Sequence, residues 1–390
     1  MYRAPDREGE AEALHGFLRA DPAKWPALAP KVMEHNDAER LRQIVDATSE
    51  RVGGVQAVSD SLEGLVVSGP LGHVLAWVRL DADGSLADLM IARSPDGYGR
   101  FMRPWHRWGT RALCFALISY WIVPCWNSAN VTGWIGSILI VLTGYVLFEG
   151  FYVVAKEPWW IRGPLRAGLL ASLVSAYRLP QLPAGHSVLG MVSGAVLLVT
   201  VTGVLFRLRR HRWGTVVTAP VKFPLRGVWF VGAGGGRWLN HHFAVPAQRG
   251  ALDLMRVGAT GASRGDPQLL DSYLAYGAKV YAPCDGRVIA AVDGLEEQVP
   301  GIVRYGPLYG NHAFIDTGTE IVKLAHLRPG TVAVTEGQLV RTGDLLGEVG
   351  NSGNSTEPHL HIHAERDGLG LDLCFTDVSG CLYQGRTVRA

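Results

Sequence analysis

Cysteine is scarce in this sequence, and its spacing does not fit a metal site built from thiolates. The five cysteines stand at 114, 125, 284, 374 and 381, and no two of them form a C-x-x-C pair. A cysteine-type zinc site is therefore not expected. Cys374 and Cys381 could close a small disulfide loop in an oxidising compartment, and unpaired thiols are the alternative.

Three further absences narrow the functional classes. The formal net charge is only +2, so no basic excess points to nucleic acid as a partner. The helical zinc motif H-E-x-x-H occurs nowhere in the chain. The polar, acidic stretch MYRAPDREGEAEALHGF does not have the apolar core of a cleavable signal peptide.

Charge is almost absent from the middle of the chain. Residues 112–148 and 187–206 contain no Asp, Glu, Lys or Arg. A hydrocarbon core of ~30 Å is crossed by about 20 apolar residues. We therefore expect a transmembrane bundle of three to four helices at 112–212 that contacts a lipid bilayer. The candidate crossings are 112–126, 131–155, 167–177 and 187–206, and the short third one could instead lie at the interface.

The basic residues around these apolar runs indicate how the helices would be oriented. Lys and Arg cluster before the first run, between the second and third, and after the last, at Arg100, Arg103, Arg107, Arg111, Lys156, Arg162, Arg166, Arg207, Arg209, Arg210 and Arg212. Positive loops tend to stay in the cytoplasm, so four crossings would place both flanking domains there. Three crossings would place the C-terminal domain outside.

Residues 1–95 are predicted to form a soluble α+β domain. AERLRQIVDATSERV has helical periodicity, and DADG is a turn signal between two strand-like runs. Helices followed by a curved antiparallel sheet, with the phrase WVRLDADGSLADLMI, resemble the cone-shaped ketosteroid-isomerase-like domains. That resemblance implies small-molecule binding or a homodimer through this domain. Residues 96–111 are expected to be a basic linker, and 213–227 a second linker.

Residues 228–390 are rich in glycine and in short apolar runs such as AKVYAPCDGRVIAAV and DLLGEVG. Short strands at close spacing predict an all-β domain, an antiparallel sheet in a barrel or sandwich. Within it, NSTEPHLHIHAE places histidines at 359, 361 and 363. Side chains alternate along a strand, so these imidazoles should share one face, which suggests a metal or proton-transfer site.

Over roughly 240–368, the segments YGAKVYAPCDGRVIAAV and GNHAFIDTGTEIVKLAHL through PHLHIHAE resemble the lysostaphin/LytM-type zinc metallopeptidases, which carry the duplicated hybrid motif. The resemblance implies that Asp253 and His361 are zinc ligands. It implies that His359 is a catalytic acid–base beside the metal and that His326 is its partner near the attacking water. Catalytic zinc keeps one position open for that water.

The sequence departs from the family pattern at one ligand. The usual histidine, four residues before the aspartate, is replaced by Arg249. The local sequence NHHFAVPAQRGALDLM resembles a branch with Asn-x-His followed by Gln-Arg-x-Ala-x-Asp, which implies that His242 supplies the third ligand, with His241 as the alternative. His363 is expected to lie behind the ligands or on the surface.

These observations lead to two functional hypotheses. The first is a membrane-anchored zinc metalloendopeptidase in a bacterial cell membrane, acting on a peptide or peptidoglycan-type substrate that contains glycine or D-amino acids. The charge pattern favours a cytoplasmic peptidase domain, whereas the family's substrate favours the outside. The second is a catalytically degenerate LytM-like module that binds or regulates, as Arg249 suggests.

Overall fold

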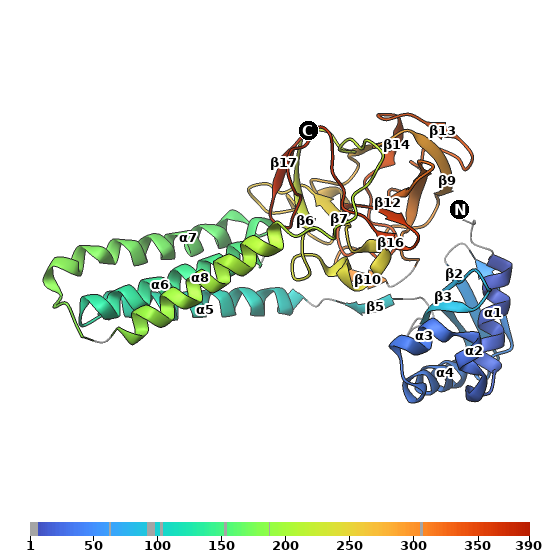
Figure 1. The fold of residues 1–390 in the computed structure, drawn as a ribbon, viewed down its shortest axis with the longest axis horizontal. Helices are drawn as coiled ribbons and strands as arrows, with labels where there is room; N and C mark the ends of the chain where they lie inside the picture. The colour runs from blue at the N-terminus through green and yellow to red at the C-terminus, as the bar shows by residue number, and fades with distance from the viewer. Residues whose placement is uncertain are drawn as a thin grey trace.

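The computed structural model describes residues 7–61, 64–91, 98–101, 104–151, 154–186, 188–304 and 307–390. Three groups of elements follow one another along the chain (Figure 1): short helices with a small sheet, a bundle of long helices, and a β-rich domain. The bundle projects from one end of the β-rich domain.

The N-terminal group has its helices first and its strands second. The helices are α1 (Arg7–Arg19), α2 (Trp25–Leu28), α3 (Pro30–His35) and α4 (Ala38–Val52), and the strands are β1 (Ala57–Ser61), β2 (Gly64–Gly69), β3 (Gly72–Leu80) and β4 (Leu86–Ile91). The strands pair in the order β1-β2-β3-β4, all antiparallel. The predicted helix AERLRQIVDATSERV is α4, and the DADG turn joins β3 to β4. The likeness to cone-shaped domains stays a prediction.

The long helices are α5 (Pro104–Asn127), α6 (Val131–Gly150), α7 (Trp159–Val174) and α8 (Leu189–Arg209). In the described part of the chain, two helices are long and apolar enough to cross a membrane, by length and composition: α6, with a mean hydropathy of 1.9, and α8, with 2.2. The bundle of three to four crossings stays a prediction, since only these two described helices meet the length and composition of a span. Helix α5 begins with the basic segment PWHRWGTR, and α7 has only 16 residues.

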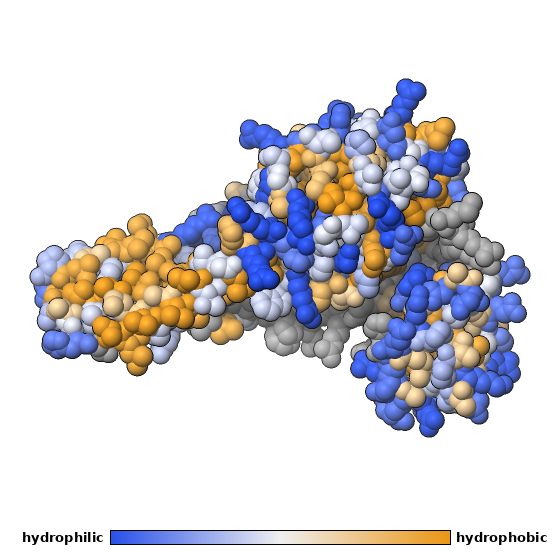
Figure 2. Space-filling model, viewed as in Figure 1, coloured by the Kyte–Doolittle hydropathy of each residue, from blue (hydrophilic) through white to orange (hydrophobic). Residues whose placement is uncertain are grey.

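Glycine allows α6 and α8 to pack closely. A Cβ added at Gly136 would lie 3.0 Å from the backbone of Gly190, and one added at Gly194 would lie 3.0 Å from Leu139. Small residues four apart let helix backbones approach in this way. Most of the α8 surface faces outward, since only 11% of its apolar window is buried. Figure 2 shows the bundle as a largely hydrophobic surface.

The C-terminal domain is an all-β structure, as predicted. Its main sheet has the order β13-β9-β11-β12-β15-β7-β6-β17, with β16 on β15, and β14 pairs with β8; every pair of strands is antiparallel. The strands are β6 (Val228–Ala233), β7 (Leu252–Met255), β8 (Lys279–Tyr281), β9 (Gly286–Val292), β10 (Ile302–Arg304), β11 (Asn311–Asp316), β12 (Ile321–Leu327), β13 (Leu339–Val340), β14 (Leu345–Glu348), β15 (Leu360–Arg366), β16 (Leu369–Gly370) and β17 (Thr387–Arg389). Strand β10 also pairs with β5 (Tyr98–Phe101).

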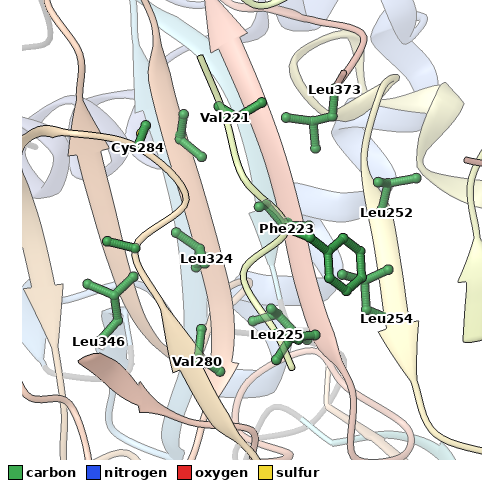
Figure 3. Close-up of a cluster of buried hydrophobic side chains, with 14 of the residues drawn as sticks. Val221, Phe223, Leu225, Leu252, Leu254, Val280, Cys284, Leu324, Leu346 and Leu373 are labelled. Carbon is green, nitrogen blue, oxygen red and sulfur yellow. The ribbon is translucent and has the colours of Figure 1, made fainter. Parts of the chain in front are cut away.

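One face of this sheet carries the core of the domain (Figure 3). Leu360, Ile362 and Ala364 of β15 are fully buried in it, because alternate residues of a strand point to the same face. Each buried side chain of the size of leucine contributes about 2 kcal/mol. The intervening residues of β15, His361 and His363, therefore point to the opposite face, so core packing orients the histidines.

Two of the expected linkers are structured. Val217, Val221, Phe223 and Leu225 of the segment 213–227 are buried in the core of the C-terminal domain, so this apolar segment is no free linker. Within 96–111, β5 and the start of α5 are described, whereas 96, 97, 102 and 103 lie outside the described residues. Cys374 and Cys381 are free thiols.

Candidate metal centre

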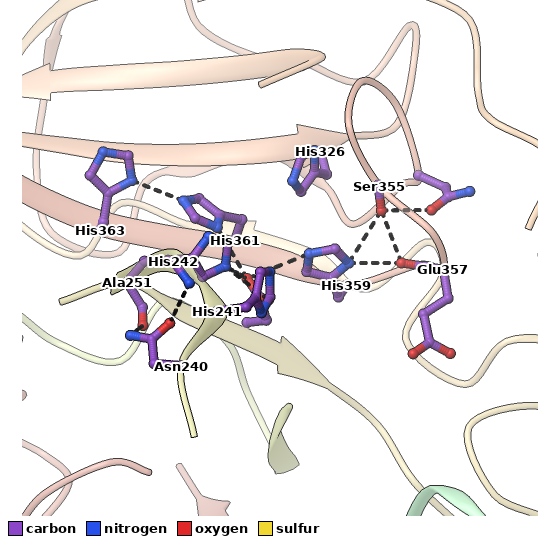
Figure 4. A network of polar contacts seen from close by, with 12 residues as sticks. Asn240, His241, His242, Ala251, His326, Ser355, Glu357, His359, His361 and His363 are labelled. Atoms are coloured by element: carbon purple, nitrogen blue, oxygen red, sulfur yellow. Dashed lines mark hydrogen bonds and ion pairs between the residues drawn. The ribbon is translucent and has the colours of Figure 1, made fainter. Parts of the chain in front are cut away.

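His361 and Asp253 meet through strand pairing. In the antiparallel pair β15–β7, His361 lies directly opposite Asp253. Their side chains touch, with 3.0 Å between Nδ1 of His361 and Oδ1 of Asp253. Both are buried, so the sheet holds a carboxylate and an imidazole together out of bulk water. Figure 4 shows His361 with His242 and the other histidines of this region.

His242 reaches the same carboxylate from a loop. Its Nε2 lies 3.0 Å from each oxygen of Asp253. Asn240 shapes this loop, because its Oδ1 accepts from the His242 N–H and its Nδ2 donates to the carbonyls of Arg249 and Ala251. The loop that carries His242 is thereby fastened to the chain that enters β7.

Arg249, at the position where the family pattern has a ligand, turns away from this centre. Its Nε donates to the Gly370 carbonyl at 2.9 Å, and its guanidinium lies over the Trp213 ring. His242 occupies the place beside Asp253 instead. The described residues therefore bring together two imidazoles and one carboxylate without any ligand from position 249.

His241 is the alternative third donor. Ligand atoms of His241, His242 and Asp253 all lie within 4.8 Å of one another, a grouping that shares two members with the set His242, Asp253 and His361. The His241 side chain is 71% exposed, and its Nε2 is 3.8 Å from Oδ2 of Asp253. His361 is buried and lies closer, so we favour the set that contains His361.

The donors fit zinc by type and by spacing. Zinc accepts imidazole nitrogen and carboxylate oxygen at ~2.1 Å, and a tetrahedral arrangement then places donor atoms about 3.4 Å apart. The His242–Asp253 and His361–Asp253 distances of 3.0 Å are close to that separation. Both separations from Asp253 therefore suit donors that share one ion.

Burial and charge set the protonation states at this centre. Burial opposes the ionised form of Asp253, but the charges of His242 and His359 prevail and hold the pKa of Asp253 well below its usual value. Burial, helped by the charge of His242, holds the pKa of His361 well below the usual histidine value. An ionised carboxylate beside a neutral imidazole is the state that binds a cation.

His359 and His326 lie together beside these donors. Their ring centroids are 4.9 Å apart, and Nε2 of His359 is 3.6 Å from Oδ1 of Asp253. His359 Nδ1 lies 2.7 Å from the Glu357 carbonyl, and His326 Nδ1 lies 2.8 Å from the Ser352 carbonyl. A carbonyl can only accept, so Nδ1 of each ring carries a proton, and Nε2 is the nitrogen that faces the centre.

His326 is held in an unusual backbone conformation, with φ of 65°. Its N–H donates to the Tyr309 carbonyl, and its own carbonyl accepts from Gly350. Non-glycine residues in this region cost about 1–3 kcal/mol and concentrate at functional sites. Burial lowers the pKa of His326 to about 3, so its imidazole is neutral.

His363 lies behind the centre, and the expectation that it could be a surface residue is wrong. It is fully buried, and its Nδ1 is 2.9 Å from Nε2 of His361. Its own Nε2 faces Glu365 at 3.7 Å, and Glu365 pairs with Lys323 at 2.9 Å. His361 thus has one ring nitrogen at the centre and the other on His363, which sets its orientation.

Three nearby residues were missed by sequence reasoning. Ser355 Oγ lies 3.2 Å from Nδ1 of His359, and the Tyr309 ring stacks on His363 at 5.8 Å between centroids. Lys156, between α6 and α7, pairs with Glu357 at 2.6 Å. Ser355 belongs to the segment NSTEPHLHIHAE, so the sequence pattern could have identified it. No pattern in the sequence connects Lys156 to Glu357.

A comparison with family models matches residues 268–373 to peptidase family M23, so the chain contains a peptidase M23 domain. His242 and Asp253 precede the matched residues, and their assignment depends on the geometry above. A curated relative, the peptidoglycan DD-endopeptidase ShyB of Vibrio cholerae, is 34% identical over 86 residues, or 22% of this chain. The chain spans only 17% of the length of that relative.

Solved structures of similar proteins include a zinc-containing peptidase from Vibrio cholerae and the catalytic domain of lysostaphin from Staphylococcus simulans. The first is 22% identical, covers 40% of this chain and 38% of its own, and has a TM-score of 0.23. The second is 16% identical, covers 37% of this chain and 79% of its own, and has a TM-score of 0.20.

Proposed function

We propose that the C-terminal domain is a zinc metalloendopeptidase that hydrolyses a peptide bond without a covalent enzyme intermediate. The observation that carries this proposal is the convergence of His242 and His361 on the buried carboxylate of Asp253, with His326 and His359 alongside. Three protein donors with an open side are typical of catalytic rather than structural zinc sites.

Each residue has a distinct part in this proposal. His242, Asp253 and His361 would hold zinc, which when bound lowers the pKa of a water and polarises the substrate carbonyl. His359 and His326 each use Nδ1–H on a carbonyl, so Nε2 is the ring nitrogen through which each would donate or accept a proton. The backbone carbonyls of Glu357 and Ser352 hold Nδ1 of both rings and thereby orient them.

We propose a peptide of the bacterial cell-wall type as substrate. The M23 match and the peptidoglycan endopeptidase among the relatives support this class. The test is to incubate the purified full chain with peptidoglycan and with glycine-rich peptides and to identify products by mass spectrometry. Hydrolysis that stops with a chelator and returns with zinc is the expected result; a zinc-free, inactive protein would favour the degenerate regulatory module instead.

We further propose that the bundle anchors the protein in a membrane with α6 and α8 as crossings. Helices α6 and α8 both end at the side of the bundle where the peptidase domain lies (Figure 1). The segment after α6 contacts that domain through the ion pair of Lys156 with Glu357. The last turn of α8 contacts it where the Leu208 carbonyl accepts from the Gly236 N–H. A reporter fused after residue 390 tests the side of the membrane. A cytoplasmic reporter agrees with the distribution of Arg and Lys, and an external one with a wall substrate.

A further inference from the structure

Two loops of the peptidase domain contact the end of the helical bundle. Gly236 donates its N–H to the Leu208 carbonyl in the last turn of α8, at 2.9 Å. The Ala259 carbonyl accepts from the Trp159 N–H and from Arg162 Nη2 at the start of α7, both at 2.8 Å. The first of these loops leads directly to His241 and His242, so the segment that carries the proposed ligand His242 starts at a contact with the bundle.

Charged and close-packed residues mark where the apolar part of the bundle ends. A Cβ added at Gly150 would lie 2.4 Å from Leu205, so these two residues stand at the same level of α6 and α8. Glu149, next to Gly150, pairs with Arg166 of α7 at 3.3 Å, which places Arg166 at this level too. Beyond it, toward the peptidase domain, α8 carries arginines.

The rise per residue of an α-helix gives the distance of each contact from the end of the apolar part of the bundle. At 1.5 Å per residue, Leu208 lies about 4.5 Å beyond Leu205, and Arg162 lies about 6 Å beyond Arg166. The headgroup layer of a bilayer is about 5–7 Å thick on each side of the hydrocarbon core. If α6 and α8 cross a membrane, both contacts with the peptidase domain fall at the depth of the lipid headgroups.

The residues at this depth are those that favour a membrane interface. Trp238, two residues after the Leu208 contact and three before His241, is 68% exposed although it belongs to a folded domain. Trp159 at the start of α7 is 64% exposed. Arg237 neighbours Trp238 and lies over the Phe243 ring. Tryptophan and arginine are enriched where one side of a residue meets lipid and the other meets water.

A third contact between the bundle and the peptidase domain lies next to the proposed catalytic histidine His359. Lys156 pairs with Glu357, two residues before His359, and the side chains are only partly exposed. The Lys156 carbonyl also packs against Gly261, where an added Cβ would lie only 2.3 Å away. The bundle therefore holds the domain on both sides of the centre, at Gly236 and at Glu357.

We propose that the loop 234–241, with Trp238 and Arg237, rests in the lipid headgroup layer, and that the metal centre acts on peptides anchored to or lying on that membrane. This inference rests on the proposed function, because it assumes a peptidase centre and a bundle that crosses the bilayer. It adds a substrate class: a peptide presented at the membrane surface, rather than a polymer remote from it.

The experiment measures the depth of three positions in the full chain reconstituted into vesicles. A fluorescent amino acid is placed at position 238, at position 199 on the exposed middle of α8, or at position 339 on β13, away from the bundle (Figure 1). Vesicles carry a nitroxide quencher either in the lipid headgroup or in the middle of the acyl chain. We expect position 238 to lose fluorescence mainly to the headgroup quencher, position 199 to the acyl-chain quencher, and position 339 to neither.

The outcomes separate this inference from the proposed membrane anchor. Quenching at 199 but no more at 238 than at 339 overturns the inference and leaves the anchor in place. No quenching at 199 overturns both the inference and the membrane anchor.

In the same vesicles, a glycine-rich peptide with a palmitoyl chain should be cleaved with a higher kcat/KM than the free peptide. Equal values overturn the substrate class, and loss of cleavage of both peptides counts against the proposed function.

Discussion

Lys156 and Glu357, which are 201 residues apart in the sequence, form an ion pair with 2.6 Å between Nζ and Oε1. The Glu357 carbonyl in turn accepts from Nδ1 of His359. A residue between two helices of the bundle is thus linked, through one glutamate, to a proposed catalytic histidine.

We predict that Lys156→Ala lowers kcat about fivefold with little change in KM and no loss of bound zinc. A partly exposed ion pair contributes ~1 kcal/mol, which equals that factor. Steady-state kinetics and metal analysis on the purified full chain measure both. Lys156→Arg should restore kcat, and Arg166→Ala, which removes an exposed pair inside the bundle, is the matched control. A fall in kcat common to Lys156→Ala and Arg166→Ala would rule out positioning through Glu357.

The assigned roles of His361 and His359 predict opposite effects on zinc. His361→Ala should remove both the metal and the activity, because it removes a ligand. His359→Ala should keep about one zinc per chain and lose about 10²–10⁴ in turnover, the range for a general acid–base group. Metal analysis with single-turnover kinetics distinguishes them, and an active His361→Ala protein contradicts the assignment.

The two adjacent histidines of the loop should differ as ligands. His242→Ala is expected to lose zinc at chelator concentrations that the wild type survives, whereas His241→Ala should retain it, because His241 is exposed and more distant from Asp253. Competition with a chromogenic chelator gives both affinities. The reverse order would move the third ligand to His241.

His363 should tune the zinc affinity from behind the centre. Residues that orient a metal-bound histidine change affinity or activity by about 10–100-fold when removed. His363→Ala leaves Nε2 of His361 without its 2.9 Å partner, so we expect a loss of affinity in that range with the fold intact. Chelator competition measures it, and circular dichroism controls for folding. An unchanged zinc affinity in a folded variant would show that His363 only fills space.

We predict that the free energy of unfolding depends on pH through Glu297, independently of zinc binding. Burial raises the pKa of Glu297 to about 7 from 4.5. The folded state therefore binds this proton more tightly than the unfolded state, and the stability it contributes is lost as pH rises from about 4.5 to about 7. Glu297→Gln should be more stable than the wild type by about 1–2 kcal/mol above that window and equal to it below. Denaturant unfolding across this pH range measures the difference, and a constant difference contradicts the prediction.

Local patterns predicted much of the fold. The period of two in PHLHIHAE places Leu360 and Ile362 in the core and His361 and His363 on the other face, and this was confirmed. The uncharged runs predicted the apolar helices α6 and α8 within a few residues. Both patterns work because burial depends on side-chain periodicity and length, which a sequence displays directly.

The prediction that residues 213–227 form a linker was wrong, because burial of this segment depends on contacts with distant parts of the chain. Its prolines and short length resemble a connection, but Val221 and Phe223 find space in the core between distant strands. Burial in that space depends on the shape of the finished domain, and no periodicity within the segment reports it.

The sequence by itself determined the residue types of the proposed metal centre and the strand that presents His361, because strand alternation and hydrophobic burial are local. Only the tertiary structure decided that Asp253 lies opposite His361, that His242 rather than position 249 reaches the carboxylate, and that Lys156 meets Glu357. Contacts between remote segments depend on strand register, loop path and helix packing together. Those are properties of the whole folded chain.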